Sequence, residues 1–81
     1  MAQQYIPQPK TRTALVLFLK GAATPVVLYF DNPQAVYQEF NQLMKSPSPV
    51  LVEKEANGPV KKICFVSTQI ASLVLQDEVY G

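Results

Sequence analysis

The sequence predicts an α+β fold: an antiparallel sheet of about five strands with one amphipathic helix on one face. Three observations predict it: an apolar hairpin in the first half, a capped amphipathic segment in the middle, and three further β-rich runs in the second half. The predicted order is strand-strand-helix-strand-strand-strand. With 81 residues, the chain is long enough for one domain with one modest core. We expect a flexible N-terminal tail over residues 1–11 and this single domain over residues 12–81.

The first two predicted strands are apolar runs at residues 14–19 and 25–30, joined by five small or polar residues. This pattern is typical of antiparallel strands with a short loop. The first run is apolar on both faces, because Leu15 and Val16 point to opposite sides and each has apolar neighbours on its own side. A strand of this kind needs cover on both faces, from its own fold or from a second copy.

The middle segment predicts one helix. Asp31-Asn32-Pro33 is a typical helix start, with Asp31 expected as the cap and Pro33 in the first turn. Apolar side chains then recur at helical spacing: Val36, Phe40, Leu43 and Met44. The helix should end near Lys45, because the Ser-Pro-Ser-Pro that follows cannot continue it.

Three β-rich runs follow the helix: residues 50–55, 60–67 and 70–75. The first two are joined by an Asn57-Gly58 turn, and the polar residues 67–69 separate the second from the third. We expect the third run to be a fifth strand, with a bent extension of the fourth as the alternative, and residues 77–81 to be a polar end. Cys64, in the middle of the fourth strand, is expected to be a small buried core residue.

The apolar content of the predicted sheet favours self-association. One helix covers only part of one side of such a sheet, so the other side must curl or meet a second subunit. Charged residues make up only 16% of the chain, with 7 basic against 6 acidic side chains, and such a surface opposes association weakly. We therefore predict a homodimer, or contact with another protein, with Phe18, Tyr29 and Phe30 as the candidate interface.

The chain lacks the residue sets that catalysis and cofactor binding commonly use. It contains no histidine, the commonest general base and zinc ligand. Glu53 and Glu55 share a strand face, but Lys61 and Lys62 are expected across the turn, and cross-strand charge pairing explains this pattern without a site. No imidazole is present to activate Cys64. We predict a non-enzymatic interaction domain with no catalytic, cofactor-binding or metal-binding residues.

Binding of single-stranded nucleic acid or RNA is the alternative function. Aromatic side chains on strands can stack on bases, and five basic residues are candidates for phosphate contact: Lys10, Arg12, Lys20, Lys61 and Lys62. The near-balanced charge disfavours this alternative, because nucleic-acid modules carry a clustered basic excess. Nucleic acid is therefore not the expected partner.

The apolar stretch over residues 14–30 is not a predicted membrane span. It is shorter than the roughly 20 residues that a spanning helix needs, and it contains Lys20 and Pro25 near its middle. As the core of a signal peptide it is also too short before Lys20. We expect a cytoplasmic protein.

Several short motifs occur in a familiar order: Thr24-Pro25, Ala35-Val36-Tyr37-Gln38-Glu39, Met44-Lys45-Ser46, Leu51-Val52-Glu53, Lys61-Lys62-Ile63 and Thr68-Gln69-Ile70-Ala71. In this order the chain resembles a family of short uncharacterised proteins of cyanobacteria and some plastids, over roughly residues 12–76. It departs from that pattern in its longer Gln/Pro tail, in Tyr29-Phe30 and in the apolar residues 73–75. The resemblance implies a soluble compartment, the cytoplasm or the plastid stroma, and no site residues.

Overall fold

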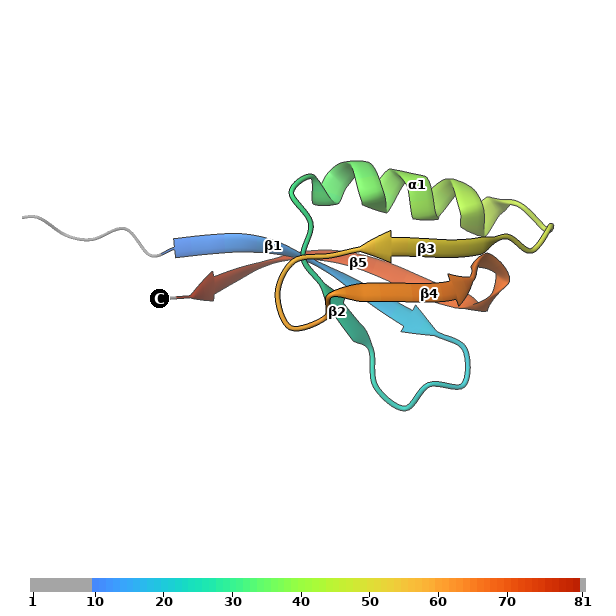
Figure 1. Ribbon diagram of the computed structural model, residues 1–81, viewed down its shortest axis with the longest axis horizontal. Helices are drawn as coiled ribbons and strands as arrows, with labels where there is room; N and C mark the ends of the chain where they lie inside the picture. The colour runs from blue at the N-terminus through green and yellow to red at the C-terminus, as the bar shows by residue number, and fades with distance from the viewer. Residues whose placement is uncertain (1–9, 81) are drawn as a thin grey trace, which may run out of the picture.

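The structure, a computed structural model, describes residues 10–80. Its elements in chain order are β1 (Lys10–Leu19), β2 (Val26–Leu28), α1 (Pro33–Lys45), β3 (Leu51–Glu55), β4 (Lys62–Val66), the 3-10 turn η1 (Ser67–Gln69) and β5 (Ile70–Tyr80) (Figure 1). The predicted fold class is confirmed, because the described part of the chain combines one α-helix with five strands in the predicted order.

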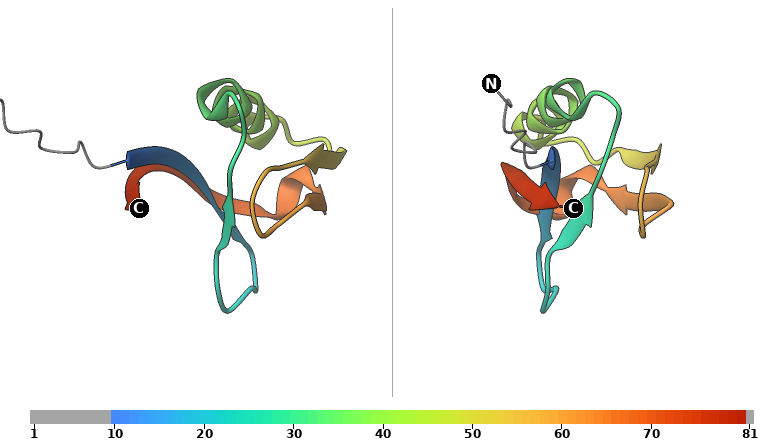
Figure 2. Two further views of the ribbon diagram at one scale, coloured as in Figure 1. Left: turned by 60° about the vertical axis from the view of Figure 1, so that its left-hand side comes forward. Right: turned by 90° about the vertical axis from the view of Figure 1, so that its left-hand side faces the viewer.

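The five strands divide into two antiparallel sheets. One has three strands in the order β2-β1-β5, and the other is the hairpin β3-β4. The sheets meet where the backbone N–H of Asn57 donates to the carbonyl oxygen of Tyr29 at 2.7 Å. Figure 2 shows that the two sheets curl around one interior and that α1 lies along one side of it.

β1 and β5 pair along their whole length, from Lys10 opposite Tyr80 to Leu19 opposite Ile70. The register shifts between Phe18 and Leu19, which leaves Ala71 as an extra residue on β5. β1 therefore starts inside the segment expected to be a tail, and β5 continues through the segment expected to be a polar end. The remaining residues of the predicted tail, 1–9, lie outside the described part of the chain.

These extensions have a non-local cause. Residues 10–13 and 76–78 are polar and show no apolar alternation of their own, so local patterning does not mark them as strands. Each becomes a strand because the other lies opposite: the Thr13 hydroxyl donates to the Asp77 carboxylate at 2.8 Å, and Arg12 lies directly opposite Glu78. Cross-strand pairs of this kind stabilise a sheet.

The helix begins and ends as the sequence indicates, with one difference in the cap. The side chain of Asn32 accepts from the Ala35 N–H at 3.3 Å, so Asn32, and not Asp31, is the cap. The Asp31 carboxylate instead accepts from the Asn57 side-chain amide at 2.9 Å, which ties the start of α1 to the end of β3. The helix ends at Lys45, where the Ser46 N–H donates to the Leu43 carbonyl oxygen.

The core lies between α1 and the two sheets. Its buried members come from every strand and from the helix: Leu15, Leu17, Leu28, Phe40, Val52, Phe65 and Ile70. Phe40 and Phe65 meet edge to face, with ring centroids 5.3 Å apart and planes at 84°, an arrangement that aromatic pairs prefer. This contact joins the helix to the β3-β4 sheet.

The expected burial of Cys64 is wrong: this thiol is exposed. Its neighbour Phe65 points into the core, and alternate side chains of a strand point to opposite faces. Cys64 therefore lies on the outer face of the β3-β4 sheet, directly opposite Glu53. Leu51 and Val66 form another directly opposed pair on this face, and Leu51 is 68% exposed.

β1 is buried on both faces without a second copy. Ala14, Val16, Leu15 and Leu17 are all buried, and Val16 is the only one of the four with any exposure, 5%. Val16 lies directly opposite Val27 on one side and Val74 on the other, so its cross-strand neighbours shield it. Of the two kinds of cover expected for this strand, its own fold or a second copy, the first therefore accounts for these four residues.

Replacing Phe40 by Ala should lower the free energy of unfolding by about 3–5 kcal/mol, because the change removes a fully buried ring and leaves a cavity against Phe65. Met44, one turn later on α1, is partly exposed, and Met44→Ala is the matched control with an expected loss below about 1 kcal/mol. Urea denaturation followed by circular dichroism measures both. Equal losses in the two variants would contradict the described core.

Candidate interaction surface

The outer face of the three-stranded sheet is the surface turned away from Leu15 and Leu17. Directly opposed residues of neighbouring strands share a face, so this face carries Val16 with Val27 and Val74, and Phe18 with Ser72. Phe18 is 37% exposed and Val74 is 39% exposed, while Val27 is half-buried. We call Phe18, Val27 and Val74 the outer patch.

A polar cluster lies beside the outer patch and orders this face. The Tyr29 hydroxyl donates to the Glu78 carboxylate at 2.7 Å and accepts from the Arg12 guanidinium at 3.1 Å. The same guanidinium lies over the Tyr29 ring, 3.9 Å from its centroid, and its Nε lies 3.4 Å from a Glu78 oxygen. The Arg12 side chain is therefore held both by a cation–π contact and by charge-assisted hydrogen bonds. The cluster links β1, the residue after β2, and β5.

The Tyr29 ring is also in contact with a glycine. Gly58 has a φ of 89°, and a Cβ at this position would lie 2.9 Å from Cδ2 of the ring. Glycine is needed at this position for two reasons. Other residues rarely adopt such a φ, and their Cβ would overlap the Tyr29 ring. The predicted Asn57-Gly58 turn thus also fixes the aromatic ring of the polar cluster.

The cluster changes the acidity of two of its members. The hydrogen bond from Tyr29 lowers the pKa of the Glu78 carboxyl, because it stabilises the ionised form, and the Arg12 charge acts in the same direction. The same hydrogen bond raises the pKa of the Tyr29 hydroxyl, because the phenol must keep its proton to donate. Ionised Glu78 and neutral Tyr29 therefore stabilise each other.

The three predicted interface residues do not share one surface. Phe18 and Tyr29 are on the outer face, but Tyr29 is half-buried and its hydroxyl has partners. Phe30 packs against the core and lines a pocket on the other side of the sheet. The prediction did not include Val27 and Val74, although alternation could have found Val74: it falls between Leu73 and Leu75, whose side chains point the other way.

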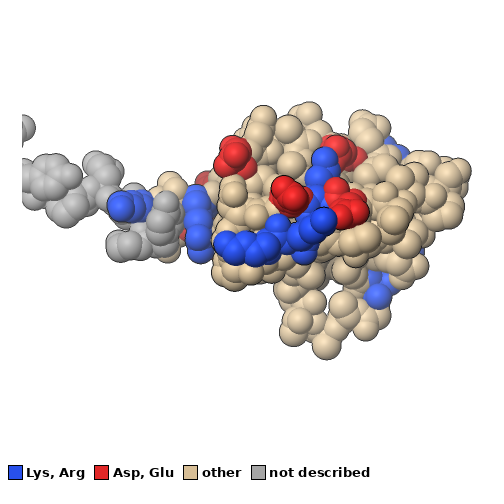
Figure 3. Space-filling view, in the orientation of Figure 1, with Lys and Arg blue, Asp and Glu red and all other residues tan. Residues whose placement is uncertain are grey.

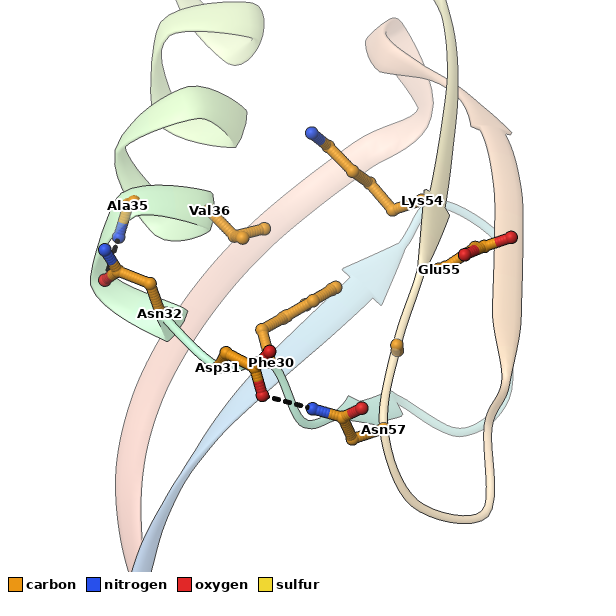
Figure 4. A pocket seen from close by; sticks show the side chains of 9 residues that line it. Phe30, Asp31, Asn32, Ala35, Val36, Lys54, Glu55 and Asn57 are labelled. Atoms are coloured by element: carbon orange, nitrogen blue, oxygen red, sulfur yellow. Dashed lines mark hydrogen bonds between the residues drawn. The ribbon is translucent and has the colours of Figure 1, made fainter.

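The pocket is an open hollow of about 470 Å³ between the start of α1 and the end of β3 (Figure 4). Phe30, Val36 and Lys54 point toward one another across it, and Glu55 points away. The Asp31–Asn57 hydrogen bond lies at its rim, and the Lys54 ammonium is paired with Glu39 at 2.6 Å. Two of its charged groups, the Asp31 carboxylate and the Lys54 ammonium, therefore already have partners within the chain.

The five basic residues predicted for the nucleic-acid alternative do not form one patch. Lys10 and Lys20 flank opposite ends of the ten-residue strand β1, about 30 Å apart at the usual rise per residue. Lys62 forms an ion pair with Glu53 at 2.6 Å, and Arg12 belongs to the polar cluster. Figure 3 shows a band of blue side chains across the left and centre of the face it presents, with red side chains beside it, and further blue side chains apart from this band.

Two further features are absent from residues 10–80. No three His, Cys, Asp or Glu side chains in this range lie close enough together to hold a metal ion. No helix in this range is long and apolar enough to cross a membrane.

Comparison with known proteins finds no matching family model, no matching curated protein and no matching solved structure.

Removing the Tyr29 hydroxyl should make stability less dependent on pH. A carboxyl with a lowered pKa contributes stability above its unfolded value, about 4.5, and that contribution is lost as the pH falls through the lowered pKa. Tyr29→Phe keeps the ring and removes the donor. Its melting temperature should therefore lie below that of the wild type at pH 7, and the difference should shrink between pH 5 and pH 3.

Tyr37→Phe is the control, because it makes the same change on α1, away from Glu78. It should leave the pH profile of the wild type unchanged. A difference between wild type and Tyr29→Phe that stays constant from pH 7 to pH 3 would show that Glu78 is not coupled to this hydroxyl.

Proposed function

We propose that this chain is a non-enzymatic interaction domain that acts as a homodimer and binds another protein through the outer patch. One observation carries the proposal: Phe18 and Val74, two large apolar side chains on adjacent strands, are each more than a third exposed on a sheet face that α1 does not cover. Adjacent exposed apolar groups on an ordered surface are typical of contact sites. The helix packs on the opposite face, against Leu15 and Leu17.

The surroundings of the outer patch support a protein partner. Aromatic and aliphatic side chains at the centre and polar groups at the rim are the usual anatomy of a protein interface. Here the Arg12–Tyr29–Glu78 cluster supplies a polar rim whose side chains are fixed by mutual contacts. A rigid rim loses little conformational freedom on binding. The resemblance to the short cyanobacterial and plastid proteins stays a prediction, as does a cytoplasmic or stromal location.

Nucleic acid is the less favoured ligand. Binding to a polyanion depends on cations that are free to neutralise phosphates, whereas Lys62 and Lys54 are paired with glutamates. The Arg12 guanidinium lies over the Tyr29 ring, 3.9 Å from its centroid, and so covers one face on which a base could stack. We also propose that the domain has no catalytic centre of its own.

Site-specific photo-crosslinking in cells that make the protein tests the outer patch. A benzoylphenylalanine in place of Phe18 should form adducts with another protein, several-fold more than the same group in place of Met44. The two positions are matched, because both side chains are 37% exposed, one on the outer face and the other on α1.

Mass spectrometry of the adducts identifies the partner. Equal yields at the two positions would contradict the proposal, because the outer patch would then be no more than an ordinary exposed surface. Adducts formed only with further copies of this chain would also contradict it, since the patch would then be the dimer contact itself.

A further inference from the structure

We infer that two copies of this chain join through the free edge of β5, in antiparallel pairing about a two-fold axis at Gln76. The inference rests on the proposed function, because it specifies how the homodimer forms. The two three-stranded sheets become one continuous six-stranded sheet, in the order β2-β1-β5 followed by the same strands of the second copy in reverse.

The first support is the state of the β5 edge. β5 lies at one edge of its sheet, and within residues 10–80 no other strand pairs with its outer side. Beyond the irregularity at Ala71, its pairing with β1 is uninterrupted from Ser72 to Tyr80. These nine residues contain no proline and no lysine, two of the features that commonly protect an edge strand from association.

The other exposed edges are protected. β2 has only three residues and follows directly after Pro25. β3 and β4 have five residues each; Pro49 precedes β3 and Lys54 lies within it, while Pro59, Lys61 and Lys62 precede or begin β4. Short length, proline and lysine all disfavour pairing with another chain. Among the strand edges in residues 10–80, the outer edge of β5 is therefore the one available for pairing with another chain.

The charges of β5 select the register. Residues 72–80 are centred on Gln76, so an antiparallel pair of full length places Gln76 opposite its own copy. Asp77 then lies opposite the second copy's Leu75, and Glu78 lies opposite the second copy's Val74, so no two carboxylates are directly opposed. An axis between residues 77 and 78 would bring these acids face to face, which destabilises a strand pair.

The acids of β5 also have partners within their own copy. Asp77 accepts from Thr13, and Glu78 accepts from Tyr29. The edge therefore carries little uncompensated charge to repel a second copy. About one backbone hydrogen bond for each paired residue would form along it.

The end of β5 extends away from most of the described fold. The ribbon formed by the start of β1 and the end of β5 extends beyond α1 and beyond the β3-β4 sheet (Figure 1). Because directly opposed side chains share a face, the pairing places the outer faces of both copies on one side of the joined sheet. The dimer therefore presents two outer patches in the same direction.

A charge placed at the axis tests this geometry. Gln76 is exposed, and Gln76→Lys puts two like charges directly opposite each other in the dimer. We expect its dissociation constant, measured by analytical ultracentrifugation, to rise at least tenfold over the wild type. Gln38→Lys makes the same change on the exposed side of α1 and should leave the constant unchanged. Circular dichroism confirms that each variant is folded.

Mixing two variants makes the test specific to the axis. Gln76→Lys and Gln76→Glu chains should each dimerise weakly alone, and an equimolar mixture should restore dimers that contain one chain of each kind. A wild type that stays monomeric at high micromolar concentration would overturn the inference. So would Gln76→Lys chains that dimerise as the wild type does. In that second case the crosslinking at position 18 could still succeed, so the failure of this inference is distinguishable from the failure of the outer patch.

Discussion

The burial of β1 on both faces is the constraint on which the rest of the structure depends. Four successive residues, 14–17, are buried, and a strand can reach this state only if something lies on each side of it. On the inner side, Leu15 and Leu17 meet α1 and the β3-β4 sheet through the common core. On the outer side, flanking strands shield Val16 and leave Phe18 partly open. The proposed interaction surface is therefore the incompletely covered side of the strand that organises the core.

The pairing of β1 with β5 links the two ends of the described chain to this constraint. Ten residue pairs hold the first strand against the last, so the sheet forms only when segments more than 50 residues apart meet. Contacts at this separation close late and carry a loop-closure cost. The Arg12–Tyr29–Glu78 cluster stabilises the outermost part of this pairing, which lies beyond the helix. The residues that shape the outer face thus also hold the ends of the sheet together.

The sequence predicts most of the local structure. Periodicity and turn residues locate α1 to within a residue at its end, both hairpins, and a separate fifth strand after residues 67–69. Where prediction fails, the deciding contact is distant: Asn32 and not Asp31 caps the helix because Asp31 bonds to Asn57. The strand character of residues 10–13 arises from residues 77–80. Cys64 is exposed because a two-stranded sheet has only one covered face.

The candidate site could be predicted only in part, for the same reason. Phe18 is recognisable as a surplus apolar side chain on the first strand, but its neighbours on the outer face depend on the register with β5. Phe30 appears similar in sequence and faces the other way, because the chain turns from β2 toward α1 at this point. Neither the ring contact of Gly58 nor the pairing of Arg12 with Glu78 has a local signature.

Amide hydrogen exchange at submicromolar concentration, read by mass spectrometry, tests most directly whether one copy suffices to bury β1. If one copy suffices, peptides that cover residues 14–17 stay protected at this concentration and exchange only through global unfolding. If on dilution these residues exchange as fast as the turn at residues 20–24, a second copy provides the cover. That result would contradict the burial of β1 within a single copy.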